Sequence, residues 1–158
     1  MELTKKQVAG IIKVLKQGKK ARPVLENIAA QTIDNQQVLV LTNSYQAITI
    51  PTKLETGFIE FKTIETWYKL ANSKDTINLD TLETVESLSV SYPDLNNVMK
   101  SKHESVDTIA LDARKLDLAQ TILGQDGVRL QFNGKFGIME VSHPETGIKG
   151  IVLPMRMN

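Results

Sequence analysis

The chain has 158 residues, of which 41% are hydrophobic and 23% are charged, and it contains no cysteine. These values are ordinary for a globular domain with a substantial core, and the lack of cysteine excludes disulfides and thiolate chemistry. The sequence opens without an apolar signal core, and no run of 18 apolar residues occurs in it. The sequence therefore predicts a soluble, cytoplasmic protein without a membrane partner.

Charge is distributed unevenly along the chain, although the net charge is only +1. Residues 1–22 contain seven basic residues and one acidic residue, whereas residues 23–158 contain twelve basic and seventeen acidic residues. Such asymmetry favours a basic segment that faces a polyanion, carried on a body that repels polyanions.

The first predicted helix covers residues 4–20, after a short strand at residues 1–3. Thr4 is a suitable N-cap, and Gly18 is a suitable end of the helix. Apolar residues recur at the three-to-four spacing of one buried face, at Val8, Ile11, Ile12 and Leu15. Five lysines fall within an arc of about 100° on the opposite face, namely Lys5, Lys6, Lys13, Lys16 and Lys20.

Strands and one further helix are predicted in the first two thirds of the chain. Three β-rich runs separated by turn residues cover residues 24–33, 36–43 and 45–51. The middle of the chain then alternates between a strand at 57–61, a helix at 64–74 capped by Thr63, and strands at 75–80 and 83–91. The stretch YPDLNNVM, residues 92–99, follows with the turn chemistry of a joint between structured units.

The last third repeats the order of the first. A strand at 105–111 precedes a helix that Asp112 caps and Gly124 ends. Asn133-Gly134 predicts a hairpin between the following strands, which cover residues 127–132, 135–141 and 148–155. The sequence thus predicts two β-α-β-β-β units, over residues 1–58 and 105–158, with a shorter middle element at 59–104.

Motifs of common enzyme chemistry are absent from the sequence. It contains no phosphate-binding glycine loop and no nucleophile elbow, and its two histidines lack metal-ligand spacing. Four carboxylates gather loosely around the middle strands, at Asp75, Asp80, Glu83 and Glu86. A solvated acidic face is favoured over a divalent-metal pair for nuclease chemistry. The pattern favours a binding protein over an enzyme, with no catalytic residue, metal or cofactor.

Several stretches resemble the bacterial sliding clamp, the β subunit of DNA polymerase III. GIKGIVLPMRMN, residues 147–158, resembles the C-terminal strand and Met-Pro-Met-Arg-Leu-like tail of that family. YPDLNNVM resembles the family's Tyr/Phe-Pro-Asp-Tyr joint. ARPVLENIAAQ with VLVLTNSYQAITI, and DTIALDARKLDLAQTILGQDGVRLQF, resemble its Arg-Pro strand passage and its last strand-helix-strand passage. One departure is NSYQ at residues 43–46, where the family usually has Thr-Asp-x-Glu.

The resemblance implies an α+β fold of sliding-clamp type, in which β-α-β-β-β units place antiparallel sheets outside and helices on the inner face. Residues 1–158 are then expected to form a single clamp-like domain. The implied function is that of a processivity factor that encircles or cradles double-stranded DNA and tethers a polymerase. Bacterial clamps close a ring of six domains, so a homo-oligomer is expected of this chain. Its small size suggests a bacteriophage or mobile-element origin.

The resemblance also assigns site residues. Basic residues of the helices would face the DNA phosphates, namely Lys5, Lys6, Lys13, Lys16, Lys20, Lys69, Arg114 and Lys115, and so would Arg22, which matches the arginine before proline in the family's motif. The tail would help to form an apolar pocket for a clamp-binding peptide, through Leu153, Pro154, Met155 and Arg156.

Plainer interpretations remain open at this stage. The lysines could serve solubility, and the tail could be a last core strand. Trp67 could stack on single-stranded nucleic acid, although core packing is favoured. A monomeric clamp-like adaptor or inhibitor that binds replication proteins without encircling DNA is the alternative function, and a metal nuclease ranks below both.

Overall fold

The structure is a computed structural model and describes residues 1–88, 90–99, 109–134 and 137–155. Its helices are α1 (Lys5–Ala21), α2 (Phe61–Leu70), α3 (Asn96–Met99) and α4 (Ala113–Leu123), with 3-10 turns η1 (Pro23–Glu26) and η2 (Leu79–Thr81). Its strands are β1 (Glu2–Thr4), β2 (Ile28–Ile33), β3 (Gln36–Thr42), β4 (Gln46–Pro51), β5 (Phe58–Ile59), β6 (Thr76–Asn78), β7 (Arg129–Phe132), β8 (Met139–Ser142) and β9 (Lys149–Val152).

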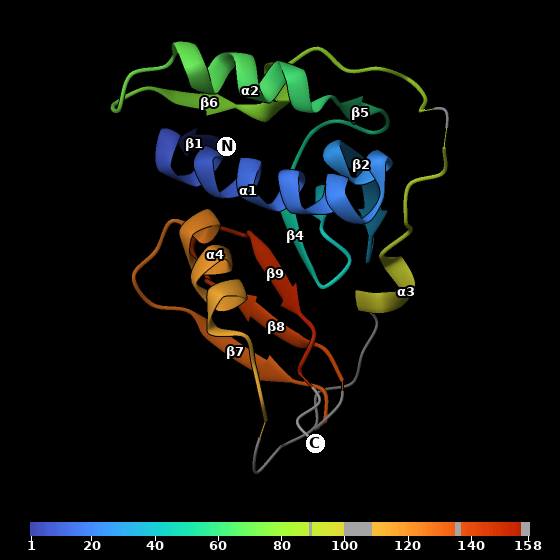
Figure 1. The fold of residues 1–158 in the computed structure, drawn as a ribbon, viewed down its shortest axis with the longest axis vertical. Coiled ribbons are helices and arrows are strands. Elements are labelled where there is room, and N and C mark those ends of the chain that lie inside the picture. Colours follow the sequence, from blue (N-terminus) through green and yellow to red (C-terminus); the bar gives the residue numbers. More distant parts are fainter. Residues whose placement is uncertain (89, 100–108, 135–136, 156–158) are drawn as a thin grey trace.

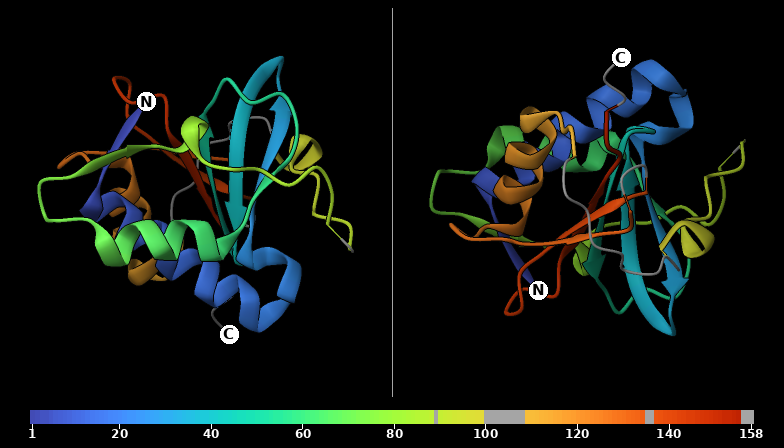
Figure 2. Two further views of the ribbon diagram at one scale, coloured as in Figure 1. Left: turned by 90° about the horizontal axis from the view of Figure 1, so that it is seen from above. Right: turned by 90° about the horizontal axis from the view of Figure 1, so that it is seen from below.

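Seven strands form one antiparallel sheet in the order β5-β2-β3-β4-β9-β8-β7, and β1 pairs with β6 in a separate two-stranded sheet. The three long helices lie on one side of the large sheet, with α1 between α2 and α4 (Figure 1). Figure 2 shows α3 on the opposite side of the strands. The fold is therefore α+β, with the three long helices on one face of an antiparallel sheet, as the sequence predicted.

Helix α1 begins and packs as its pattern predicts. Thr4 and Gln7 form a capping box, in which the threonine side chain accepts the N–H of Gln7 and the glutamine side chain accepts the N–H of Thr4. The apolar face, which also includes Val14, is buried in the main core. The helix does not end at Gly18 but continues to Ala21. Because Gly18 has no side chain, α1 can lie close to the carbonyl groups of Leu25 and Thr42.

The strands β2, β3 and β4 form a meander because local turn chemistry joins them. Asp34 and Asn35 both have positive φ, 48° and 62°, as a two-residue hairpin turn requires. In β3, Leu39 and Leu41 face the core beneath the helices, whereas Val38 and Val40 face a second apolar cluster on the other side. Burial on both faces explains the nearly continuous apolar run of this strand.

The stretch YPDLNNVM covers the face of the sheet opposite the long helices. Leu95 is buried there and Tyr92 packs beside it, and the Tyr92 hydroxyl donates to the Val40 carbonyl at 3.2 Å. The Gln31 amide fixes the segment, because Nε2 donates to the Pro93 carbonyl at 2.7 Å and Oε1 accepts the Leu95 N–H at 3.2 Å. Burial raises the pKa of the Tyr92 phenol. The joint is thus a strap bound to the sheet.

The C-terminal elements extend the same sheet. Strand β9 pairs antiparallel with β4, with Ala47 opposite Ile151, and β8 and β7 follow outward. Helix α4 packs along α1 at Gly10, where an added Cβ would lie 2.7 Å from a side-chain carbon of Ile122. Of the predicted second unit, the helix and its three following strands are confirmed.

Several sequence predictions differ from the structure. Helix α2 begins at Phe61 and ends at Leu70, rather than covering 64–74. The predicted strand at 83–91 is wrong within its described part, where only Val85 forms an isolated bridge, to Phe58. Residues 109–111 are not a strand, and 105–108 lie outside the described residues.

The hairpin between β7 and β8 is confirmed, but not as a two-residue turn at Asn133-Gly134. The register pairs Phe132 with Met139, whereas a two-residue turn at Asn133-Gly134 would pair Phe132 with residue 135. The unit boundaries at residues 58 and 104 remain predictions.

Candidate functional site

The layer formed by α1, α2 and α4 concentrates positive charge on one face of the molecule. These three helices contain ten basic and two acidic residues, whereas the rest of the chain contains nine basic and sixteen acidic residues. The charge asymmetry is thus one between the three long helices and the rest of the chain.

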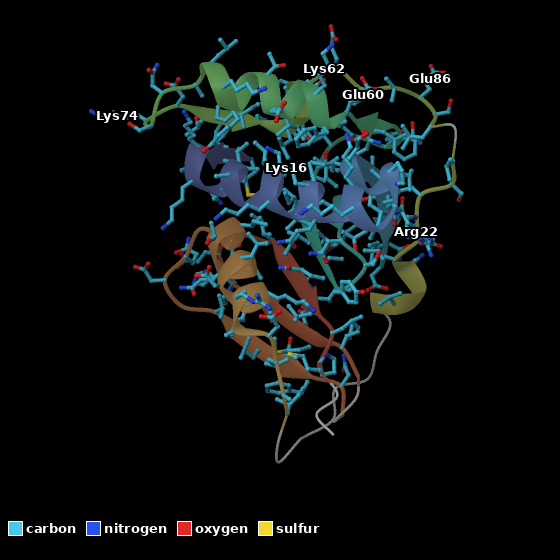
Figure 3. The ribbon with its side chains drawn as sticks, viewed as in Figure 1. Lys16, Arg22, Glu60, Lys62, Lys74 and Glu86 are labelled. Atoms are coloured by element: carbon cyan, nitrogen blue, oxygen red, sulfur yellow. The ribbon has the colours of Figure 1, made fainter. Side chains whose placement is uncertain are left out.

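Two of the predicted lysines contact α2. Lys5 Nζ donates to the Ala71 carbonyl at 2.5 Å and lies 5.0 Å from the centre of the Tyr68 ring. Lys16, labelled in Figure 3, pairs with Glu65 at 3.4 Å and lies 5.7 Å from the centre of the Phe61 ring. Both residues stand at the edge of the basic arc that faces α2, and their charges are partly engaged within the fold.

Lys69 of α2 shares the same carboxylate. Its Nζ lies 2.9 Å from Oε2 of Glu65, four residues earlier on the helix. Hydrogen bonds from Lys69, and then from Lys16, lower the pKa of the Glu65 carboxyl, so this group stays ionised and offsets part of the charge of both lysines. Lys69 is therefore a weaker candidate for phosphate contact than its exposure suggests.

The other edge of the arc is free. Lys6, Lys13 and Lys20 are exposed, and within the described part of the chain their ammonium groups have no ion pair or hydrogen bond. They are seven residues apart, so they form a nearly straight row along α1 with a spacing of about 10 Å. Figure 1 shows α1 as the central element of the helix layer. This row is the part of the predicted set that is best placed to meet a polyanion.

The beginning of α4 adds two cations near the end of this row. The Arg114 guanidinium pairs with Asp112 through two hydrogen bonds of 2.9 Å, yet its side chain is 91% exposed. This pairing lowers the pKa of the Asp112 carboxyl, which also caps α4 by accepting the Arg114 N–H. Lys115 Nζ lies 4.8 Å from the centre of the Tyr45 ring.

A hollow of about 500 Å³, here called the basic hollow, lies between α1, the start of α4 and the β3–β4 turn. Its lining consists of Gln17, Lys20, Ala21, Asn43, Tyr45, Gln46, Asp112, Arg114, Lys115 and Leu118. Three of the predicted DNA-binding residues therefore meet around one concavity.

A second hollow, here called the apolar groove, lies between η1, the β3–β4 turn, the strap and the end of β9. It has a volume of about 320 Å³ and is lined by Arg22, Leu25, Thr42, Ser44, Tyr45, Gln46, Ala47, Pro93, Leu95, Val98, Ile151 and Leu153. Its rim carries large apolar side chains that are exposed, among them Tyr45, Val98 and Leu153. Exposed apolar surface in a concavity is typical of a binding site.

The tail residues take different positions. Leu153 lines the apolar groove, and its N–H donates to the Tyr45 carbonyl at 3.1 Å. Pro154 and Met155 follow beyond the lining, and the Met155 N–H donates to the Ala110 carbonyl. Arg156 lies outside the described residues. Arg22, predicted to contact DNA, lines the apolar groove instead of the basic hollow.

Sequence reasoning did not find Leu25, Tyr45, Leu95 and Val98 as site residues. The strap and the tail were both recognised as motifs, but only the fold brings Leu95 and Leu153 to the same groove. Two features of the sequence could have indicated them. Tyr45 is an aromatic residue in an otherwise polar turn, and Leu95 and Val98 are apolar residues in a turn-rich joint.

The remaining candidates have structural surroundings. Trp67 packs against the main core, as favoured from the sequence. Asp75 accepts the Asn72 N–H, and Asp80 accepts the Thr52 hydroxyl. Among the described residues, no three histidine, aspartate or glutamate side chains are grouped to hold a metal ion. No helix among the described residues is both long enough and apolar enough to cross a membrane.

Comparison with known proteins relates this fold to bacterial clamps. No protein-family model matches the sequence, and no curated protein is significantly similar to it. The structure, however, superimposes on DNA polymerase III subunit beta from Borrelia burgdorferi with a TM-score of 0.68 and 12% identity, over 100% of this chain and 64% of that chain. It is similarly close to the Bacillus subtilis sliding clamp, with a TM-score of 0.65, 12% identity and the same coverages.

A third structure is the Helicobacter pylori beta clamp bound to a DNA ligase peptide, with a TM-score of 0.66 and 11% identity, over 97% of this chain and 63% of that chain. The chain therefore spans somewhat less than two thirds of the length of these clamps. The resemblance inferred from the sequence is confirmed at the level of the fold: the chain has the sliding-clamp fold of the bacterial DNA polymerase III β subunit.

Proposed function

We propose that the chain binds double-stranded DNA on its helix layer as a sliding-clamp-like processivity factor, and that it performs no catalysis. The observation that carries this proposal is the charge of that layer, ten basic residues against two acidic, on a body with the opposite balance. Such a face attracts the phosphate backbone, while the acidic remainder repels it and so orients the molecule.

The row of Lys6, Lys13 and Lys20 suits contacts that do not depend on sequence. Lysine ammonium groups on flexible stems meet phosphates as point charges and carry no base-specific information. A protein that moves along DNA needs contacts of this kind, because each step must cost about the same on every sequence. The bound duplex would lie across α1, with the basic hollow at one end of the row.

The apolar groove would bind a short peptide of a polymerase or another client. The Helicobacter pylori clamp of the same fold binds a DNA ligase peptide. Here the groove offers exposed apolar side chains from the strap, the β3–β4 turn and β9. An apolar peptide side chain that enters it would remove this surface from water.

Topology distinguishes a clamp from an ordinary DNA-binding protein. A closed homo-oligomer should remain on nicked circular duplex and slide off the free ends of linear duplex, while both forms show a steep fall of affinity with salt. Binding is measured to both forms across a salt series, together with the mass by light scattering. A monomeric mass with and without DNA would contradict the ring, and no affinity for either form at low salt would contradict the DNA-binding face.

Two half-exposed apolar residues near the end of the described chain offer a matched test of the groove. Leu153→Ser should weaken binding of the DNA ligase peptide at least about tenfold, since Leu153 lines the groove and burying a leucine contributes about 1.5–3 kcal/mol. Met155→Ser should leave peptide affinity nearly unchanged, although Met155 is the more exposed, at 48% against 39%. Isothermal titration with each variant measures both, and equal losses in the two would contradict the assignment of the groove.

The alternative is a monomeric adaptor that binds clamp partners without DNA. The apolar groove supports it, because that groove requires neither ring nor duplex. An adaptor would bind the peptide with normal affinity and show no affinity for duplex at low salt.

A further inference from the structure

The basic hollow and the apolar groove share a wall. Tyr45 and Gln46 line both of them, one residue after the other in the β3–β4 turn. Gln46 is 3% exposed and fixed, since its Nε2 donates to the Lys115 carbonyl at 3.0 Å. Tyr45 is 60% exposed and stands between the two hollows. The state of one aromatic ring therefore affects the shape of both sites.

The backbone of Tyr45 is held at both of its polar groups. Its N–H donates to Asn43 Oδ1 at 3.1 Å, and its carbonyl accepts the Leu153 N–H at 3.1 Å. Asn43 Oδ1 also accepts the Gln46 N–H at 2.9 Å. Because the turn is fixed in this way, the Tyr45 ring can change position only by rotation of its side-chain torsions, which is fast at an exposed site.

Lys115 holds the ring in its present position. Its Nζ lies 4.8 Å from the ring centre, within the range of a cation–π contact. Such a contact is weak at an exposed site, and a charge-assisted hydrogen bond from an ammonium group to phosphate is stronger. Lys20 and Arg114 line the same hollow, so a phosphate bound between them would draw Lys115 away from the ring.

We propose that Tyr45 couples the two sites, so that DNA phosphate in the basic hollow weakens peptide binding in the apolar groove. This inference rests on the proposed function, because it requires both ligands. Released from Lys115, the ring turns onto the groove, where Val98 and Leu153 expose apolar surface beside it. There it occupies space that a peptide side chain needs. The chain then has two states, one with the ring beneath Lys115 and one with the ring over the groove.

Linkage requires the coupling to be reciprocal. If duplex lowers the peptide affinity by some factor, peptide must lower the duplex affinity by the same factor. A single ring that moves between two weak contacts supports a factor of about five, the lower end of typical couplings. The chain would thus hold DNA and a client less firmly together than it holds either one alone.

The experiment measures the dissociation constant of the fluorescent DNA ligase peptide by anisotropy, without and with saturating short duplex, and then the reciprocal titration. The wild-type chain should show an increase of about fivefold in both directions. Tyr45→Ala should bring the factor to one, whatever it does to each affinity alone. Tyr45→Phe should keep the coupling, because the phenylalanine ring binds a cation in the same way.

Lys115→Met provides an independent test of the contact between Lys115 and the Tyr45 ring. Without the ammonium group the ring is already released, so the peptide affinity measured without DNA should fall to the DNA-bound value of the wild-type chain. Duplex should then change it no further. Electrostatic or steric competition between the ligands predicts the opposite, a coupling that survives in both Tyr45→Ala and Lys115→Met.

The outcomes separate this inference from the proposed function. If both ligands bind and neither changes the affinity of the other, the coupling is wrong and the proposed function stands. If coupling persists in Tyr45→Ala, the ring is not its carrier and the inference is wrong. If either ligand fails to bind alone, the proposed function fails and the coupling fails with it.

Discussion

The double substitution Lys13→Glu/Lys20→Glu should lower duplex affinity about sixtyfold at 0.1 M salt, or more. Each lysine–phosphate contact releases counterions with a log–log slope of about −0.9, which amounts to about eightfold per contact at that concentration. Two lost contacts give the sixtyfold, and repulsion by the new carboxylates adds to it. The salt slope should also become shallower by about 1.8. Fluorescence anisotropy across a salt series measures both quantities.

The control variant makes the same change of charge at two lysines outside the helix layer. Lys53 follows β4, and Lys149 pairs with Glu140 at 3.8 Å on the strand side of the fold. Lys53→Glu/Lys149→Glu should retain most of the affinity, because these residues lie off the proposed binding face. Equal losses in the two double variants would mean that net charge alone drives binding, which the proposed face does not allow. The Lys13→Glu/Lys20→Glu variant should unfold like the wild type, since exposed substitutions usually change stability within about 0.5 kcal/mol. In the control, Lys149→Glu removes the pair with Glu140 and places two carboxylates side by side, so that variant should be slightly less stable.

The elements that the sequence predicted well are those with local causes. Helix α1 follows from an apolar period, a capping residue and a length of 17 residues. The β2–β3 hairpin follows from Asp34 and Asn35, which tolerate positive φ. In both cases the residues that determine the element lie within it or next to it, so no tertiary information was needed.

The errors have tertiary causes. Residues 83–91 alternate like a strand, but β5 offers them only two residues, and Phe58 alone pairs with Val85. Gly18 suits a helix end, yet the contacts of α1 with η1 and β3 carry the helix one turn further. Pattern alone does not say whether a strand has a partner or whether a glycine is needed for close approach.

The candidate site likewise has a part that local sequence could predict and a part that depends on tertiary contacts. The basic arc of α1 could be predicted, because helix geometry alone brings its lysines to one face. The sequence could not show that α2 engages Lys5 and Lys16 and leaves Lys6, Lys13 and Lys20 free. The apolar groove was still harder to predict, because η1, the β3–β4 turn, the strap and β9 are far apart in the chain and meet only in the fold.

Gly18 links the stability of the fold to both hollows. Gly18→Ala should destabilise the chain by about 2 kcal/mol, although alanine is favoured over glycine within a helix by about 1 kcal/mol. A Cβ at residue 18 would lie 2.6 Å from the carbonyl oxygen of Thr42 and 2.7 Å from that of Leu25. Both are backbone atoms, so relief requires α1 to move away from β3 and η1. Overpacking of this kind costs about 3 kcal/mol, which outweighs the gain in helix propensity.

Urea denaturation measures the effect as a lower midpoint at an unchanged slope. Gly127→Ala is the control, because an added Cβ there meets nothing within 4 Å. That substitution should leave stability unchanged or raise it by up to about 1 kcal/mol, through the reduced freedom of the unfolded chain. A Gly18→Ala variant as stable as the control would contradict the close contact. The displacement of α1 would also move Lys20 in the basic hollow and Leu25 in the apolar groove, so folded Gly18→Ala should bind both DNA and peptide more weakly.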